Sequence, residues 1–231
     1  MEESVLDSVP QEWCPVIADV FREAAPLFVE LANMYGYRLR LGETAVRNVN
    51  GQMQKECSHY STETKMIYMD ENKDPEEYAE TFRHEYGHFM DDVLGRISMN
   101  DNFGFALEAD NFWLDNSKIE GVENFSAMLD NLSSTDAIHS RYISDILSGV
   151  FLNDTKIRET YNSQGLPFYG HDTNNYWLSW PAEEKIVEKE TFANLYALYL
   201  KGEKADIAFV ERWFPNVTKR FKTELEGVSH G

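Results

Sequence analysis

One short motif, two histidines four positions apart with a glutamate between them, constrains this chain more than any other feature. The segment His84-Glu-Tyr-Gly-His88 follows a helix start at Asp74-Pro-Glu-Glu77, where an acidic N-cap, a proline and a glutamate occur in the expected order. Residues four apart on a helix lie on the same face, so both imidazoles can reach one ion while Glu85 stands beside it. The sequence therefore predicts a helix over residues 74–95 that carries two metal ligands, His84 and His88.

This set of side chains is typical of a hydrolytic zinc site. Zinc lowers the pKa of a coordinated water to about 7, and a neighbouring carboxylate can accept the proton as that water attacks a peptide carbonyl. Glu85 is the expected general base. We expect one Zn²⁺ ion as cofactor, although two histidines and a carboxylate would also accept other divalent ions.

The third ligand lies outside the motif. A metzincin would continue with glycine at position 91 and histidine at position 94, but this chain has Asp91 and Leu94, which excludes that class. A carboxylate on a second helix is the usual alternative. Glu190 is our first choice because Ala193 and Ala197 are small enough to let its helix approach closely. Other acids remain candidates at this point: Glu183, Glu184, Glu188, Glu108 and Asp110.

Two acids after the motif are candidates for orienting a ligand imidazole. Asp91 and Asp92 lie three and four residues after His88, within reach of a ring N–H that a carboxylate commonly fixes in metal sites. Acids are otherwise unfavourable near the negative end of a helix. We expect one of them, Asp92 first, to hold a histidine in place.

The remaining sequence predicts a single domain, 1–231, organised around this helix. Residues 1–36 form a helical lead-in that Pro26 kinks or divides, and residues 37–69 alternate short apolar and turn segments that are typical of a small sheet. We expect strands at Tyr37–Leu41 and Lys65–Met69 among others. Residues 96–180 and 181–231 show helical patterns. The predicted fold class is α+β, mostly helical with a small N-terminal sheet.

Composition limits the partners and the location. The chain has 40 acidic and 21 basic residues, a net charge of −19, and no basic run, which excludes a surface that follows nucleic-acid phosphates. The start Met1-Glu-Glu-Ser4 resembles no secretory signal, and no stretch approaches the roughly 18 apolar residues of a membrane span. We expect a cytoplasmic protein without membrane contact. The acidic excess favours solubility first, and basic substrates as a hypothesis.

The two helical motifs resemble those of a known peptidase family. His84-Glu-Tyr-Gly-His-Phe-Met-Asp-Asp92, followed by Glu190-Thr-Phe-Ala-Asn194, is similar to the anthrax lethal factor-like zinc peptidases, a gluzincin-type family with a zincin-like fold. Between them, Ser144-Asp-Ile-Leu147 and Tyr169-Gly-His171 with Tyr176-Trp177 resemble the metallopeptidase domains associated with bacteriophage MuF minor head proteins. The resemblance covers residues 57 to 225. It implies a zincin-like fold, Glu190 as third ligand and endopeptidase activity.

The chain departs from the family in two places. The family has a tyrosine one or two turns before the third ligand that can stabilise the oxyanion, but position 183 is glutamate here. We expect Tyr176 to take this role, with Tyr169 next, and His171 to donate to the same oxygen. The long interval before Glu190 implies that residues 96–180 are an inserted helical subdomain.

We also expect a strand before the motif helix to bind the substrate. Lys65–Met69 corresponds to the position where zincins place the edge strand that pairs with an extended substrate. Such pairing recognises the peptide backbone.

We expect a zinc-dependent endopeptidase that acts on a peptide or protein and is associated with a phage or prophage. A first alternative is a phage structural module in which zinc only braces the fold. It predicts a closed fourth coordination position, phage structural proteins as partners and a place in the phage particle. A second alternative is a lethal factor-like toxin or effector, exported by a non-classical route. Its chemistry would also be zinc-dependent peptide hydrolysis, but its target would lie in another cell.

Overall fold

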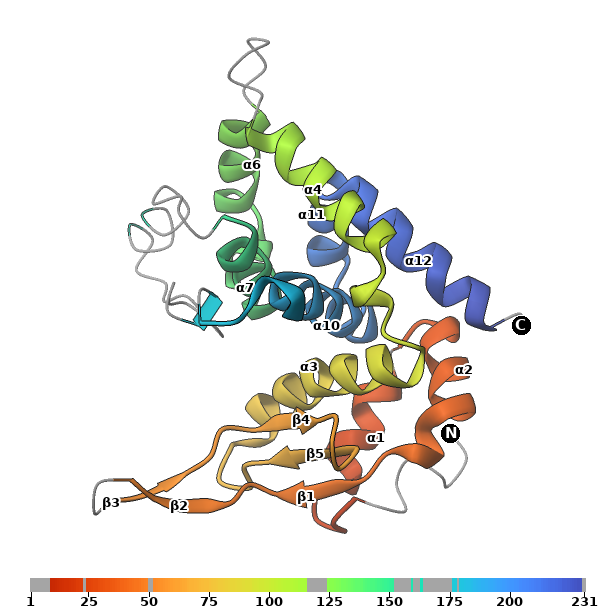
Figure 1. Cartoon of the computed structure of the whole chain (residues 1–231), viewed down its shortest axis with the longest axis vertical. Helices are drawn as coiled ribbons and strands as arrows, with labels where there is room; N and C mark the ends of the chain where they lie inside the picture. Colours follow the sequence, from red (N-terminus) through yellow and green to blue (C-terminus); the bar gives the residue numbers. More distant parts are fainter. Residues whose placement is uncertain are drawn as a thin grey trace.

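The structure, a computed structural model, describes residues 9–22, 24–49, 52–115, 124–151, 159, 163, 176–177 and 179–229. The described chain is mostly helical with a small sheet, which confirms the predicted α+β class. Figure 1 shows the sheet at one end of the molecule, helix α3 (Pro75–Val93) lying over it, and helix α10 (Ile186–Lys201) on the opposite side of α3. Helix α3 is therefore the central layer of the fold.

Two helices precede the sheet because Pro26 divides the predicted lead-in. Helix α1 spans Cys14–Arg22, and helix α2 spans Pro26–Tyr35 with the proline at its first position. The Phe21 ring of α1 meets the Tyr86 ring of α3 edge-on, with centroids 5.2 Å apart. This contact packs α1 against the helix that carries the motif.

The sheet has the strand order β1 (Leu41–Glu43), β5 (Met66–Met69), β4 (His59–Ser61). Strand β1 is parallel to β5, and β4 is antiparallel to it. The prediction that β5 is the edge strand is therefore wrong, because β1 pairs with its other side and leaves β4 at the edge.

The first strand is shorter than predicted. Residues Gly36–Arg38 form the 3₁₀ turn η2, so the chain becomes extended and pairs with β5 only from Leu41. A separate antiparallel hairpin, β2 (Val46–Val49) with β3 (Gln52–Lys55), projects beyond the sheet (Figure 1). It connects β1 to β4 in the chain.

Helix α3 begins and ends where the sequence predicts. The Asp74 carboxylate accepts a hydrogen bond from the Glu77 N–H at 2.9 Å, and Pro75 occupies the first position. Gly95, with φ of 90°, follows the C-cap Leu94 and allows the chain to turn away.

The rest of the described chain is helical. Its elements are η3 (Ile97–Met99), α4 (Asp101–Asp115), α6 (Asn124–Ser133), η4 (Asp136–His139), α7 (Arg141–Val150), η5 (Ala182–Glu184), α11 (Lys204–Trp213) and α12 (Pro215–Ser229). Helix α7 packs against α10, and α4 packs against α12. None of the described helices combines the length and apolar character needed to cross a membrane.

Helices α3 and α10 approach each other closely at Gly87, where they cross. A Cβ built on Gly87 would lie 2.6 Å from the carbonyl oxygen of Ala193 and 2.7 Å from its Cα. Side chains larger than hydrogen at position 87 would push the two backbones apart. The glycine inside the histidine motif thus sets the distance between α3 and α10.

We predict that Gly87→Ala lowers the free energy of unfolding by about 1–3 kcal/mol, because the added methyl group meets backbone atoms that cannot move independently. Urea unfolding measures the change. Gly227→Ala on α12 is the matched control, since a Cβ there meets nothing within 4 Å. It should raise stability by up to about 1 kcal/mol, the usual gain for alanine over glycine in a helix. Equal effects at both positions would contradict the close approach.

Candidate metal centre

Three side chains from α3 and α10 converge where these helices cross. The Nε2 atoms of His84 and His88 lie 3.2 Å apart, and Glu190 Oε2 lies 3.2 Å from the first and 3.3 Å from the second. Tetrahedral zinc with ligand bonds of about 2.0–2.1 Å places neighbouring ligand atoms about 3.3 Å apart. The three atoms therefore form one face of a tetrahedron whose size fits such an ion, and the structure contains a potential metal-binding triad.

Among the acids that the sequence left as candidates, the structure brings Glu190 to the histidines. Asp110 instead accepts hydrogen bonds from the N–H groups of Asn216 and Val217, at 3.0 and 2.8 Å, and so caps the start of α12. Glu184 pairs with Lys189. Within the described part of the chain, one group of three potential ligands lies close enough to share an ion, and it contains Glu190.

The triad is electrostatically prepared for a cation. Burial disfavours the charged form of both imidazoles, but the Glu190 carboxylate outweighs burial and raises the pKa of each, that of His88 to about 9. Burial likewise opposes the charge of Glu190, yet the two histidines hold the pKa of this carboxyl well below its usual range. The buried negative charge of Glu190 is thus balanced by protons on the imidazoles, and a bound cation could take the place of those protons.

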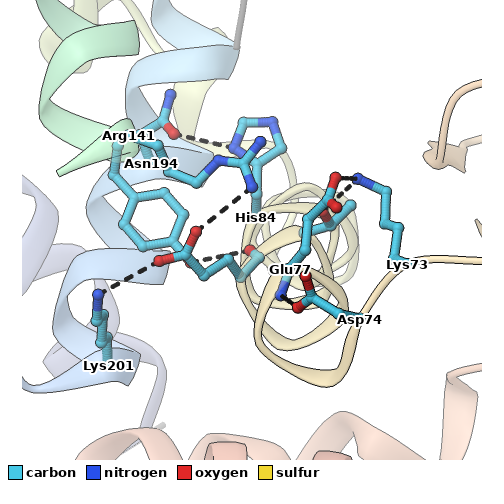
Figure 2. A network of polar contacts seen from close by, with 10 residues as sticks. Lys73, Asp74, Glu77, His84, Arg141, Asn194 and Lys201 are labelled. Carbon is cyan, nitrogen blue, oxygen red and sulfur yellow. Dashed lines mark hydrogen bonds and ion pairs between the residues drawn. The ribbon is translucent and has the colours of Figure 1, made fainter. Parts of the chain in front are cut away.

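His84 is oriented by a chain of two buried polar residues. Its Nδ1 lies 3.0 Å from Asn194 Oδ1, and Asn194 Nδ2 donates to Asp145 Oδ2 at 2.7 Å. Figure 2 shows the Asn194 amide facing the His84 ring. An Nδ1–H that donates to Asn194 leaves the Nε2 lone pair of His84 for a metal. Sequence reasoning missed both residues, although Asn194 follows Glu190 by one helical turn and could have been found by that spacing.

Asp91 and Asp92 bind other groups than the expected imidazole. Asp91 accepts hydrogen bonds from the N–H and the hydroxyl of Ser98, at 2.9 and 2.5 Å, and thereby holds η3. Asp92 accepts from three groups: the Tyr60 hydroxyl at 2.7 Å, Lys65 Nζ at 2.5 Å and Arg96 Nε at 3.2 Å. The side chain that orients His84 is instead Asn194 of α10. Residue spacing along α3 could not have predicted this partner.

Glu85 stands beside the triad, as its offset on the helix predicts. Its side chain is buried, and its Oε2 accepts a hydrogen bond from the main-chain N–H of Tyr60 at 2.8 Å. It lines the same cleft as His84, and its negative charge contributes to raising the pKa of His84, His88 and Tyr176. This is the position that a base acting on a water at the centre would need.

Tyr176 reaches the centre, and Trp177 anchors it. The Tyr176 hydroxyl donates to Glu190 Oε1 at 2.7 Å, the oxygen other than the one that faces the histidines. The Trp177 indole N–H donates to Ser148 Oγ at 3.1 Å, and its ring lies so close to Gly149 that a Cβ there would approach it to 2.9 Å. The two aromatic residues therefore have different roles: Trp177 is core and Tyr176 belongs to the site.

The other predicted residues of this segment, His171 and Tyr169, lie outside the described residues. Their roles stay predictions.

A cleft of about 600 Å³ opens beside the triad. His84, Glu85 and Asn194 line it at the centre, and it continues along the first half of α3. Its walls carry three ion pairs: Lys55–Asp70 at 2.8 Å, Lys73–Glu77 at 2.6 Å and Arg141–Glu80 at 3.4 Å. Figure 2 shows the second of these pairs, together with Arg141 of the third, in the neighbourhood of His84. The volume is in the range of ordinary ligand sites.

Comparisons of the chain with protein-family models, with curated proteins and with solved structures find no match. The resemblance of the two motifs to zinc peptidases therefore stays a prediction from the sequence.

We predict that metal binding at this centre depends on pH. In the metal-free protein His88 carries a proton at pH 7, because its pKa is about 9, and a ligand imidazole must be neutral. Zinc must displace that proton, so its apparent association constant should rise by about tenfold per pH unit between pH 7 and 8. Competition with a chromophoric chelator measures the constant. An affinity that does not change over this range would contradict the coupling.

We predict that Tyr176→Phe weakens zinc binding by about tenfold, because the third ligand loses the group that orients it. Chelator competition on the variant and the wild-type protein measures this loss. Tyr199→Phe is the matched control: its hydroxyl also donates to a carboxylate, Glu211 Oε1 at 2.9 Å, and the residue does not line the cleft. An unchanged zinc affinity combined with slower peptide hydrolysis would contradict the orienting role and favour the predicted role at the oxyanion.

Proposed function

We propose that this protein is a zinc-dependent endopeptidase of the zincin type. One observation carries the proposal: His84, His88 and Glu190 form one face of a tetrahedron, and Glu85 stands beside that face where a cleft opens. Two histidines, a glutamate ligand and an adjacent carboxylate are the side chains that metal-assisted peptide hydrolysis requires.

The number of ligands supports a catalytic centre over a bracing one. Structural zinc sites use four protein ligands, whereas catalytic sites use three and keep the fourth position for water or substrate. Within the described residues, the cluster has three members. We therefore propose a catalytic centre, and a phage structural module with a closed zinc site is the alternative.

The roles of the chain's own residues follow from their positions. When bound, zinc supplies acidification of a water molecule and polarisation of the scissile carbonyl. Glu85 accepts a proton from the attacking water and then donates it to the leaving amine. The Tyr60 N–H holds one oxygen of this carboxylate, and Tyr176 holds Glu190 so that Oε2 faces the histidines.

Strand β4 supplies the edge at which an extended substrate would add. The Ile67 N–H donates to the Arg40 carbonyl at 2.9 Å, so the main chain of Ile67 faces β1. Tyr60 lies opposite Ile67 in the antiparallel pair, and its N–H and carbonyl consequently face away from β5, toward Glu85. A peptide that pairs with this edge is recognised through its backbone beside the metal centre.

The substrate is thus a peptide or protein, and the net charge of −19 favours basic ones. Phage or prophage association and a lethal factor-like effector role use the same chemistry on different targets. Both derive from the motif resemblance.

We predict that Glu85→Gln retains zinc and lowers the hydrolysis of a generic peptide mixture by at least about 100-fold, because the variant keeps the shape of the side chain but cannot accept the proton. Metal analysis and mass spectrometry of the products measure the two effects. Glu76→Gln, at an exposed position of the same helix, is the control and should leave both unchanged. A zinc-loaded wild-type protein without hydrolysis, or a Glu85→Gln protein that hydrolyses normally, would refute the proposed function.

A further inference from the structure

Tyr60 of strand β4 contacts helix α3 at three points. Its main-chain N–H donates to Glu85 Oε2 at 2.8 Å, its ring meets the Phe89 ring edge-on at 6.0 Å, and its hydroxyl donates to Asp92 Oδ2 at 2.7 Å. Glu85, Phe89 and Asp92 are spaced by four and three residues, so they lie on one face of the helix. A single residue of the sheet edge is therefore held along two turns of α3.

Asp92 forms a firm anchor for the Tyr60 hydroxyl. The Asp92 side chain is only 8% exposed, and it also accepts from Lys65 Nζ at 2.5 Å and from Arg96 Nε at 3.2 Å. Burial opposes its charge, but Lys65, Tyr60 and Arg96 together keep the pKa of this carboxyl below its usual value. Asp92 thus stays a charged acceptor, and Tyr60 stays the donor.

The anchor also holds the turn that connects β4 to β5. Lys65 adopts a left-handed conformation with φ of 58°, and its N–H donates to the Ser61 carbonyl at 2.8 Å. Because Lys65 and Tyr60 bind the same carboxylate, the strand and its turn are fixed together on α3.

We propose that Tyr60 is a positioning residue for Glu85, and that Asp92 acts on Glu85 through it. Asp92 fixes the hydroxyl, Phe89 fixes the ring, and the main chain of Tyr60 then presents its N–H to the carboxylate. A carboxylate held at one oxygen loses rotational freedom and directs its second oxygen in a defined direction. The inference rests on the proposed function, in which Glu85 is the base.

The same arrangement couples the base to the substrate edge. The Tyr60 N–H binds Glu85, while its carbonyl lies on the edge of β4 that faces away from β5. Because Tyr60 both holds Glu85 and carries this carbonyl, it sets the distance between Glu85 and a substrate that pairs with the carbonyl. Loosening Tyr60 should therefore slow the chemical step more than it weakens substrate binding.

Tyr60→Phe tests this, because it removes the hydroxyl and keeps the ring and the N–H. We expect kcat to fall about tenfold and KM to stay within about twofold, with zinc content unchanged. Asp92→Asn should have a similar effect, and the double variant should lose little more than either single one. Tyr199→Phe is the matched control, since its hydroxyl also donates to a carboxylate, Glu211 Oε1 at 2.9 Å, but on α10 and α11.

Hydrogen exchange at the amide of residue 60, followed by NMR, tests the contact without any reaction. We expect a protected amide in the wild-type protein and about tenfold faster exchange in Glu85→Ala and in Tyr60→Phe, with no change in Tyr199→Phe. Equal exchange in the wild type and Glu85→Ala overturns the inference. Faster exchange with an unchanged kcat in Tyr60→Phe also overturns it and leaves the proposed function intact. A wild-type protein without hydrolysis refutes the proposed function, and the exchange rates still decide whether Tyr60 holds Glu85.

Discussion

The backbone contact between Gly87 and Ala193 is the constraint on which the rest of this structure depends. His84 and His88 flank the glycine on α3, and Glu190 and Asn194 lie on either side of the alanine on α10. Because a Cβ at position 87 would lie 2.6 Å from a carbonyl oxygen, only glycine allows this distance. It brings the three ligand atoms to separations of 3.2 and 3.3 Å, which a tetrahedral ion requires.

Each functional group at the centre is held by a different part of the fold. Asn194 and Asp145 connect His84 to α7, Tyr176 binds Glu190, and Tyr60 connects Glu85 to the sheet edge. Groups held in this way lose little freedom when a metal or a substrate arrives. The helices after α3 and the sheet before it thus both contribute residues that hold the side chains of the candidate metal centre, although neither carries the histidine motif.

Local chemistry explains which predictions from the sequence are confirmed. Asp74 and Pro75 begin α3, Gly95 follows its C-terminal end, and Pro26 begins α2. These signals act within a few residues. The errors concern partners that are distant along the chain: β5 is central because β1 pairs with it, and Asp92 binds the β4–β5 hairpin instead of an imidazole.

The sequence by itself determined the helix that carries His84, Glu85 and His88, because caps and a four-residue spacing act through local backbone geometry. The sequence also reduced the candidates for the third metal ligand to a few acidic residues. Only the tertiary structure decided that Glu190 shares the centre, that Asn194 orients His84 and that Tyr60 holds Glu85. These contacts depend on the crossing of α3 with α10 and on the order of the strands. Both arise from packing between segments that are far apart in the sequence, so local sequence patterns cannot predict them.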